Sequence, residues 1–102
     1  MSVAVTVGSV SALNTGEMQA FDVSGRRIAI ANVGGSYYAF GNVCTHLQCP
    51  LVKGELEGMT VTCACHGSQF DVTSGAVLRG PAEEPVESYQ VVVEGDSLQV
   101  EV

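Results

Sequence analysis

The chain has 102 residues, of which 46% are hydrophobic and 15% are charged. This length fits one domain, because single cores usually span about 100 to 200 residues, and the composition is too apolar for a disordered chain. Eleven acidic residues against four basic ones give a net charge of -7, so contact with nucleic acid or with an anionic membrane would begin with electrostatic repulsion. We therefore expect neither as a partner.

Strand-like segments begin at the start of the chain. The opening residues have no Lys or Arg ahead of their apolar stretch and alternate valines at 3, 5 and 7, which favours a strand over a signal peptide. No apolar run approaches the roughly 20 residues that span a bilayer, so we expect a cytoplasmic protein. The strands predicted in chain order are 3–7, 18–23, 27–32, 37–40, 59–63, 88–94 and 97–102.

Turn residues separate these segments. Positions 24–25 and 34–36 are typical of hairpin connections, and 94–96 joins two alternating segments, the second of which places Leu98 and Val100 on one face. No amphipathic stretch of 11 or more residues is present, because glycines and β-branched residues interrupt each candidate. The sequence predicts an all-β fold, a β-sandwich or small barrel.

All four cysteines and both histidines lie between residues 44 and 66. The surrounding segment, about 41–81, is richer in turn residues than its flanks, so we interpret it as a cluster-binding subdomain inserted in the β base of a single domain, 1–102. Residues 83–101 carry six acidic residues and no basic one, which makes the rest of the surface acidic.

Two short motifs offer metal ligands. Cys44 and His46 are followed, after sixteen residues, by Cys63 and His66. Two loops that each supply one sulfur and one nitrogen can bind a dinuclear iron cluster, with two Cys on one iron and two His on the other. A tetrahedral zinc site would use the same residue types, and a disulfide framework would leave the histidines idle. A four-cysteine ferredoxin spacing fails, because position 52 is Val52.

The sequences CTHLQCPL and CHGSQFD resemble the signature of the Rieske family. The resemblance implies a Rieske-type fold with two ligand loops and one [2Fe-2S] cluster. It also implies that Cys44 and Cys63 bind the inner iron, and that His46 and His66 bind the outer iron near the surface.

Cys49 and Cys65 remain outside the ligand set. In the Rieske proteins of respiratory and photosynthetic complexes, cysteines at these positions form a disulfide between the loops, and the resemblance implies the same pair here. Two free buried thiols in a reducing cytosol are the alternative.

The resemblance also assigns residues around the cluster. It implies that the Ser68 hydroxyl donates a hydrogen bond to a bridging sulfide, whereas Phe70 stands where high-potential members have a Tyr that bonds a cysteine sulfur. Losing that donor makes reduction harder. The backbone amide of Gly67 lies beside the cluster in such proteins. The residues expected to shield the cluster from water are Leu47, Pro50, Leu51 and Pro81.

No dinucleotide fingerprint, Ser/His/Asp set or third ligand set accompanies the motifs, so we expect a one-electron carrier and not an enzyme. The resemblance implies a monomeric ferredoxin component of a ring-hydroxylating oxygenase system, passing electrons from a flavin-containing reductase to a terminal oxygenase in transient complexes. The alternatives are a Rieske domain of a quinol-oxidising complex and a small subunit of a nitrite-reductase-like or arsenite-oxidase-like enzyme.

Overall fold

A computed structural model describes residues 4–23, 25–43, 49–65 and 67–101. No helix in these ranges has the length and apolar character needed to cross a bilayer. The described elements are β1 (Ala4–Ser9), the 3-10 turn η1 (Val10–Ala12), β2 (Met18–Val23), β3 (Arg26–Val33), β4 (Ser36–Gly41), the 3-10 turn η2 (Leu51–Lys53), β5 (Glu55–Glu57), β6 (Thr60–Thr62), β7 (Gln69–Asp71), β8 (Val77–Arg79), β9 (Ser88–Glu94) and β10 (Ser97–Glu101).

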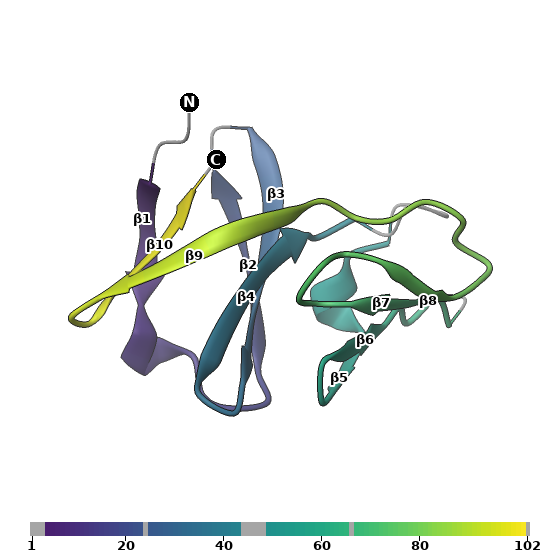
Figure 1. Ribbon diagram of the computed structural model, residues 1–102, viewed down its shortest axis with the longest axis horizontal. Helices are drawn as coiled ribbons and strands as arrows, with labels where there is room; N and C mark the ends of the chain where they lie inside the picture. Colours follow the sequence, from purple (N-terminus) through teal and green to yellow (C-terminus); the bar gives the residue numbers. More distant parts are fainter. Residues whose placement is uncertain (1–3, 24, 44–48, 66, 102) are drawn as a thin grey trace.

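Six strands form one antiparallel sheet in the order β1-β10-β9-β4-β3-β2, which curls so that its two edges approach each other (Figure 1). A Cβ atom at Gly8 on β1 would lie 3.6 Å from the ring of Phe21 on β2. The predicted hairpin between β9 and β10 is confirmed: Glu94 pairs with Ser97, and the two-residue turn contains Gly95 at φ +62°. Ser24, in the predicted turn before β3, lies outside the described residues.

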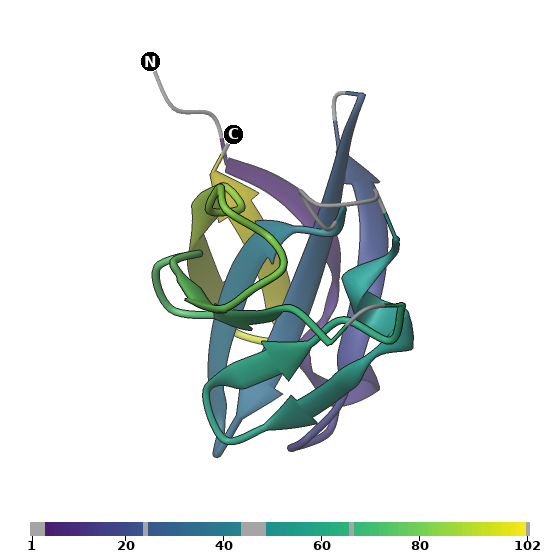
Figure 2. The same cartoon turned by 90° about the vertical axis from the view of Figure 1, so that its right-hand side faces the viewer.

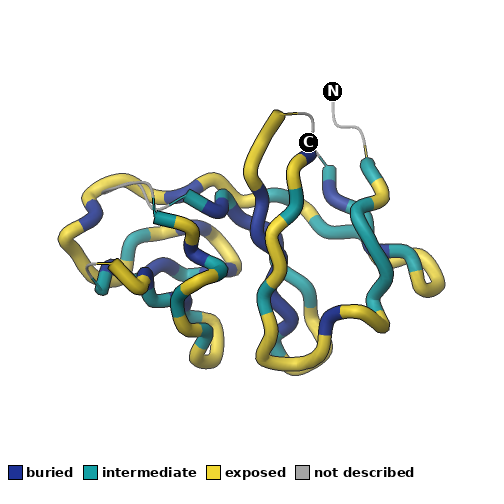
Figure 3. Tube along the Cα trace, turned by 180° about the vertical axis from the view of Figure 1, so that it is seen from behind, coloured by how far each residue is buried: buried dark blue, intermediate teal, exposed yellow. Residues whose placement is uncertain are grey.

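The strand β3 contributes to two cores, because successive side chains point to opposite faces of a sheet. Ile28 and Ile30 pack inside the curled sheet, where the predicted apolar face of β10 joins them. Ala29 and Ala31 face the second core, and their small side chains leave room for the layer that covers this face. The tube in Figure 3 shows these buried stretches near the middle of the strands and exposed residues at the turns.

That covering layer is a small antiparallel sheet of order β5-β6-β7-β8, which the chain builds between β4 and β9. It lies against one side of the larger sheet (Figures 1 and 2). Its core is Val61, Phe70 and Val72, which pack with Leu51 of η2. The sequence did not predict β5, β7 or β8, since three residues are too few to display an alternating pattern. The predicted strand 59–63 is shorter, running from Thr60 to Thr62 as β6.

Candidate metal centre

Cys63 follows directly after β6 and is 2% exposed. Its backbone N–H donates to the Ser68 carbonyl over 2.8 Å, and its carbonyl accepts the Gly67 N–H over 3.1 Å. Gly67 has φ +78°, a conformation that residues with a Cβ rarely adopt. These bonds close a tight loop that presents a buried thiol at its start.

A disulfide joins the two motifs. Cys49 and Cys65 are bonded, with their Cα atoms 6.5 Å apart. The structure thus has the disulfide and not the two free thiols. The sulfurs of Cys49, Cys63 and Cys65 all lie within 4.8 Å of one another. Because two of them are bonded to each other, Cys63 is the thiol of this group that can still ligate a metal.

Ser68 is fully buried, and its Oγ accepts the backbone N–H of Ala82 over 3.0 Å. A hydroxyl that accepts one bond still has a proton to donate. Among the residues that the structure describes, no acceptor is bonded to that proton. Phe70, also fully buried, belongs to the same core as Cys63. A buried donor without a described acceptor, near a buried thiol, fits a bound cluster that supplies sulfur acceptors.

Residues on either side of the first motif are held in place by backbone contacts. Val43 and Pro50 form an isolated antiparallel bridge. Further on, a Cβ at Gly54 would lie 1.9 Å from the Thr62 carbonyl oxygen, so only glycine allows this approach to β6. The segment that follows the first motif is therefore packed directly against β6, the strand that comes just before Cys63.

The expected shielding residues fall into different environments. Leu51 is fully buried in the core below the loops, while Pro50 and Pro81 are exposed. Leu51 therefore supports the first motif from beneath. The expected ligands Cys44, His46 and His66, together with Leu47, lie outside the described residues.

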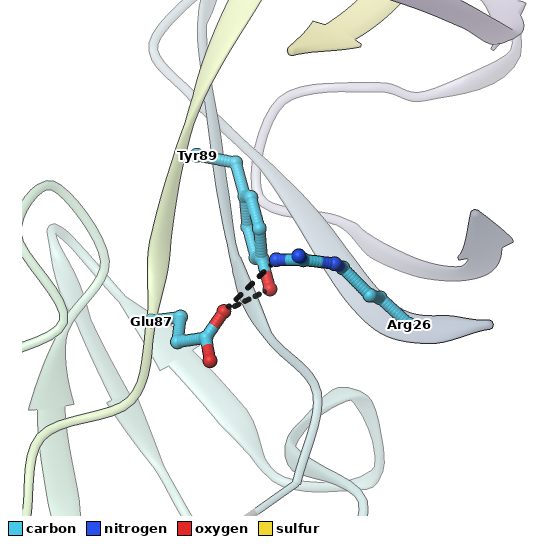
Figure 4. Close-up of polar contacts among 3 residues, drawn as sticks. All are labelled: Arg26, Glu87 and Tyr89. Carbon is cyan, nitrogen blue, oxygen red and sulfur yellow. Dashed lines mark hydrogen bonds and ion pairs between the residues drawn. The ribbon is translucent and has the colours of Figure 1, made fainter. Parts of the chain in front are cut away.

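A polar cluster occupies a groove of about 710 Å³ that Val43 also lines. Arg26 lies 3.5 Å from the Glu87 carboxylate, which also accepts the Tyr89 hydroxyl proton, and the guanidinium is 6.0 Å from the Tyr89 ring centroid (Figure 4). Burial, followed by the bond to Glu87, raises the pKa of Tyr89. Exposed pairs of this kind contribute little stability, and Cys63, the expected ligand that the structure describes, does not line the groove.

Sequence reasoning missed three residues that shape this region. Asn42, just before the first motif, accepts hydrogen bonds from the residues that follow that motif. Gly54 permits the close packing of its segment against β6, and Ala82 supplies the N–H that bonds to Ser68. Only Asn42 gave a signal, as a turn-forming residue just ahead of a ligand motif. The other two act through backbone groups, which the sequence does not distinguish.

A small all-β domain with a buried thiol beside a loop-joining disulfide is the architecture of an iron–sulfur electron carrier. The family pattern described as the Rieske [2Fe-2S] domain matches residues 3–90, and the chain belongs to that family.

Several relatives are named as ferredoxin components of dioxygenase systems. The ferredoxin component of the naphthalene 1,2-dioxygenase system of Pseudomonas aeruginosa is 32% identical over 85% of this chain and 84% of its own length. The solved ferredoxin of carbazole 1,9a-dioxygenase from Nocardioides aromaticivorans IC177 is 35% identical, with a TM-score of 0.93 over 97% of each chain. A solved complex of reduced oxygenase and oxidised ferredoxin in carbazole 1,9a-dioxygenase matches with 27% identity and a TM-score of 0.91, over 96% of this chain and 92% of that one.

Proposed function

We propose that this chain is the electron-carrying ferredoxin of a ring-hydroxylating oxygenase system, taking single electrons from a flavin-containing reductase and delivering them to a terminal oxygenase. The observation that carries the proposal is the buried Cys63 beside the disulfide of Cys49 and Cys65, in a fold that overlays an oxygenase ferredoxin along almost its whole length. No substrate-binding apparatus accompanies it in the sequence.

Four residues would hold the cluster: Cys44 and Cys63 on the inner iron, and His46 and His66 on the outer iron. Bound there, a [2Fe-2S] cluster supplies a one-electron couple that neutral imidazole ligands move to roughly -150 to +300 mV, against about -400 mV for clusters with four thiolates. The chain's own contribution is to keep the Cys63 thiol out of water and to hold the buried Ser68 hydroxyl, through the Ala82 N–H, in the loop that follows Cys63.

Docking to partners follows from the charge distribution. The acidic surface, with a net charge of -7, favours partners with basic faces and steers them from a distance. A carrier that serves two partners in turn must release each of them, so we infer transient complexes. We also infer a monomeric state and a cytoplasmic location. Leu51, fully buried, takes no part in docking.

Metal analysis and spectroscopy test the proposal. The purified protein is expected to contain two iron and two acid-labile sulfides per chain and to give, on reduction, the low average g value of a nitrogen-ligated iron. Replacing His46 or His66 by Ala should abolish this signal, while the same change at an exposed residue such as Met59 should not. A colourless protein with one zinc would end the proposal.

The alternative is a Rieske domain of a quinol-oxidising complex, which the disulfide between Cys49 and Cys65 favours. Phe70, in place of a Tyr donor, argues against the high potential that quinol oxidation requires. A redox titration separates the two: a potential well above 0 mV with rapid reduction by a quinol would favour the alternative, and a negative potential with reduction by a flavin-containing reductase would favour the carrier.

A further inference from the structure

Asn42 is a buried polar residue two positions ahead of Cys44, and it bonds to two separate parts of the chain, β3 and η2. It is 7% exposed. Its backbone N–H donates to the Arg27 carbonyl on β3 over 3.0 Å. Its carbonyl accepts the Leu51 N–H, and its side-chain Oδ1 accepts the Val52 N–H, both over 3.0 Å. Both acceptors therefore serve the chain that follows the first motif.

These two bonds replace a missing cap. The 3-10 turn η2 begins after Pro50, which makes no side-chain capping bond. The first N–H groups of such a turn need acceptors from elsewhere. Asn42 supplies them from across the first motif, one from its backbone carbonyl and one from its side chain, so the segment after Cys49 is fixed to a residue just before Cys44.

The contacts continue from η2 to the second motif. The turn ends at Gly54, whose backbone packs against the Thr62 carbonyl so closely that a Cβ would lie 1.9 Å from that oxygen. Thr62 is the last residue of β6, and Cys63 follows it directly. One connected path thus runs from Asn42 through η2 and Gly54 to the loop of Cys63.

We propose that Asn42 is a positioning residue for the cluster. Its Oδ1 accepts the Val52 N–H, and this bond fixes the first ligand motif relative to Cys63. This inference rests on the proposed function. Without the bond, the Val52 N–H loses its partner and η2 is held less tightly, although the bond from the Leu51 N–H and the disulfide remain, so the separation of the two motifs varies more. The cluster is then lost faster and its surroundings become heterogeneous.

A matched set of variants tests this in the holoprotein. Asn42→Leu removes the acceptor at nearly constant volume, and Asn42→Asp keeps it. Asn32→Leu is the control, because Asn32 is also buried and its Oδ1 also accepts a backbone N–H, that of Gly35, while its amide donates to the Leu13 carbonyl; it lies near the other end of β3. If Asn42→Leu does not accumulate with its cluster, Asn42→Ser takes its place, since its shorter side chain also withdraws the acceptor.

The measurements are the rate of absorbance loss with a chelator, the EPR line width of the reduced protein, and hydrogen exchange of the peptide that contains Val52. Asn42→Leu should lose its cluster about ten-fold faster than wild type, with broader lines and faster exchange. Asn42→Asp and Asn32→Leu should stay within about two-fold of the wild-type loss rate. Equal rates for Asn42→Leu and Asn32→Leu, or an Asn42→Asp variant no better than Asn42→Leu, would overturn the inference. A wild-type protein without iron and sulfide would instead overturn the proposed function, and the inference with it.

Discussion

The Ser68 hydroxyl offers the sharpest test of how this chain sets its reduction potential. Its Oγ accepts the Ala82 N–H over 3.0 Å and is fully buried, and among the described residues no acceptor is bonded to its own proton. Reduction adds negative charge at the cluster, and a donor to a cluster sulfur stabilises the reduced form more than the oxidised one. Ser68→Ala should therefore lower the potential.

The size of the shift follows from the strength of such a bond. A hydrogen bond to a charged acceptor contributes about 1.5 to 3 kcal/mol. If roughly half of this is gained only on reduction, its loss lowers the potential by about 30 to 65 mV, since tenfold in a one-electron equilibrium is about 59 mV. The same substitution removes the acceptor of the Ala82 N–H, which is itself in a buried residue, and should lower the free energy of unfolding by about 1 to 3 kcal/mol.

Protein-film voltammetry on wild type and Ser68→Ala measures the shift. The control is Ser74→Ala, because the Ser74 hydroxyl also accepts a backbone N–H, that of Ala76 over 3.3 Å, but in the exposed turn between β7 and β8. The Ser74 variant should keep the wild-type potential. An unchanged or higher potential in Ser68→Ala would refute the reasoning, even if the variant were less stable.

Three other changes probe the frame of the site. With Cys49 and Cys65 both replaced by Ser, the holoprotein should release iron faster, and mass analysis of denatured, alkylated wild type should count two modifiable thiols; four would contradict the disulfide. Gly54→Ala should lower the unfolding free energy, measured by chemical denaturation, by at least about 2 kcal/mol, because the new Cβ would meet a backbone carbonyl of β6. Gly8→Ala is the control and should be tolerated. Equal losses in the two variants would argue against the close approach of Gly54 to β6. Hydrogen bonds from Thr73 hold the pKa of Asp71 below its usual value, so their stabilisation is present above about pH 4 and is lost as the pH falls further. Asp71→Asn should therefore make the unfolding free energy depend less steeply on pH in that acid range. An unchanged pH profile would count against this role of Asp71.

The sequence predicted the long strands well, because their alternation reports burial. The strands β2 and β9 begin and end where the pattern places them, and Leu98 and Val100 are buried as expected. Of the small sheet, β6 was predicted and β5, β7 and β8 were missed, since a three-residue strand such as β7, with Phe70 as its single buried residue, leaves no periodic trace.

The residues of the site could be predicted in part for a similar physical reason. A side chain with its own chemistry, such as Cys63, can be identified from residue type and spacing, and Ser68 was assigned through the family resemblance. The frame that holds them uses backbone groups, such as the carbonyl near Gly54 and the N–H of Ala82, and these are the same in every residue. Cys49 and Cys65 were paired because of a family resemblance, and the structure places that bond.

The pairing of β1 with β10 has a consequence for engineering. Ala4 lies opposite Glu101, so the first and last described residues are neighbours, on the side of the large sheet away from the small sheet (Figure 1). A reductase fused through a flexible linker at either end would be tethered without covering the small sheet. The linker's length would then set the local concentration of the two proteins. Turnover of such fusions as a function of linker length would report how far the reductase must travel around the barrel to deliver its electron.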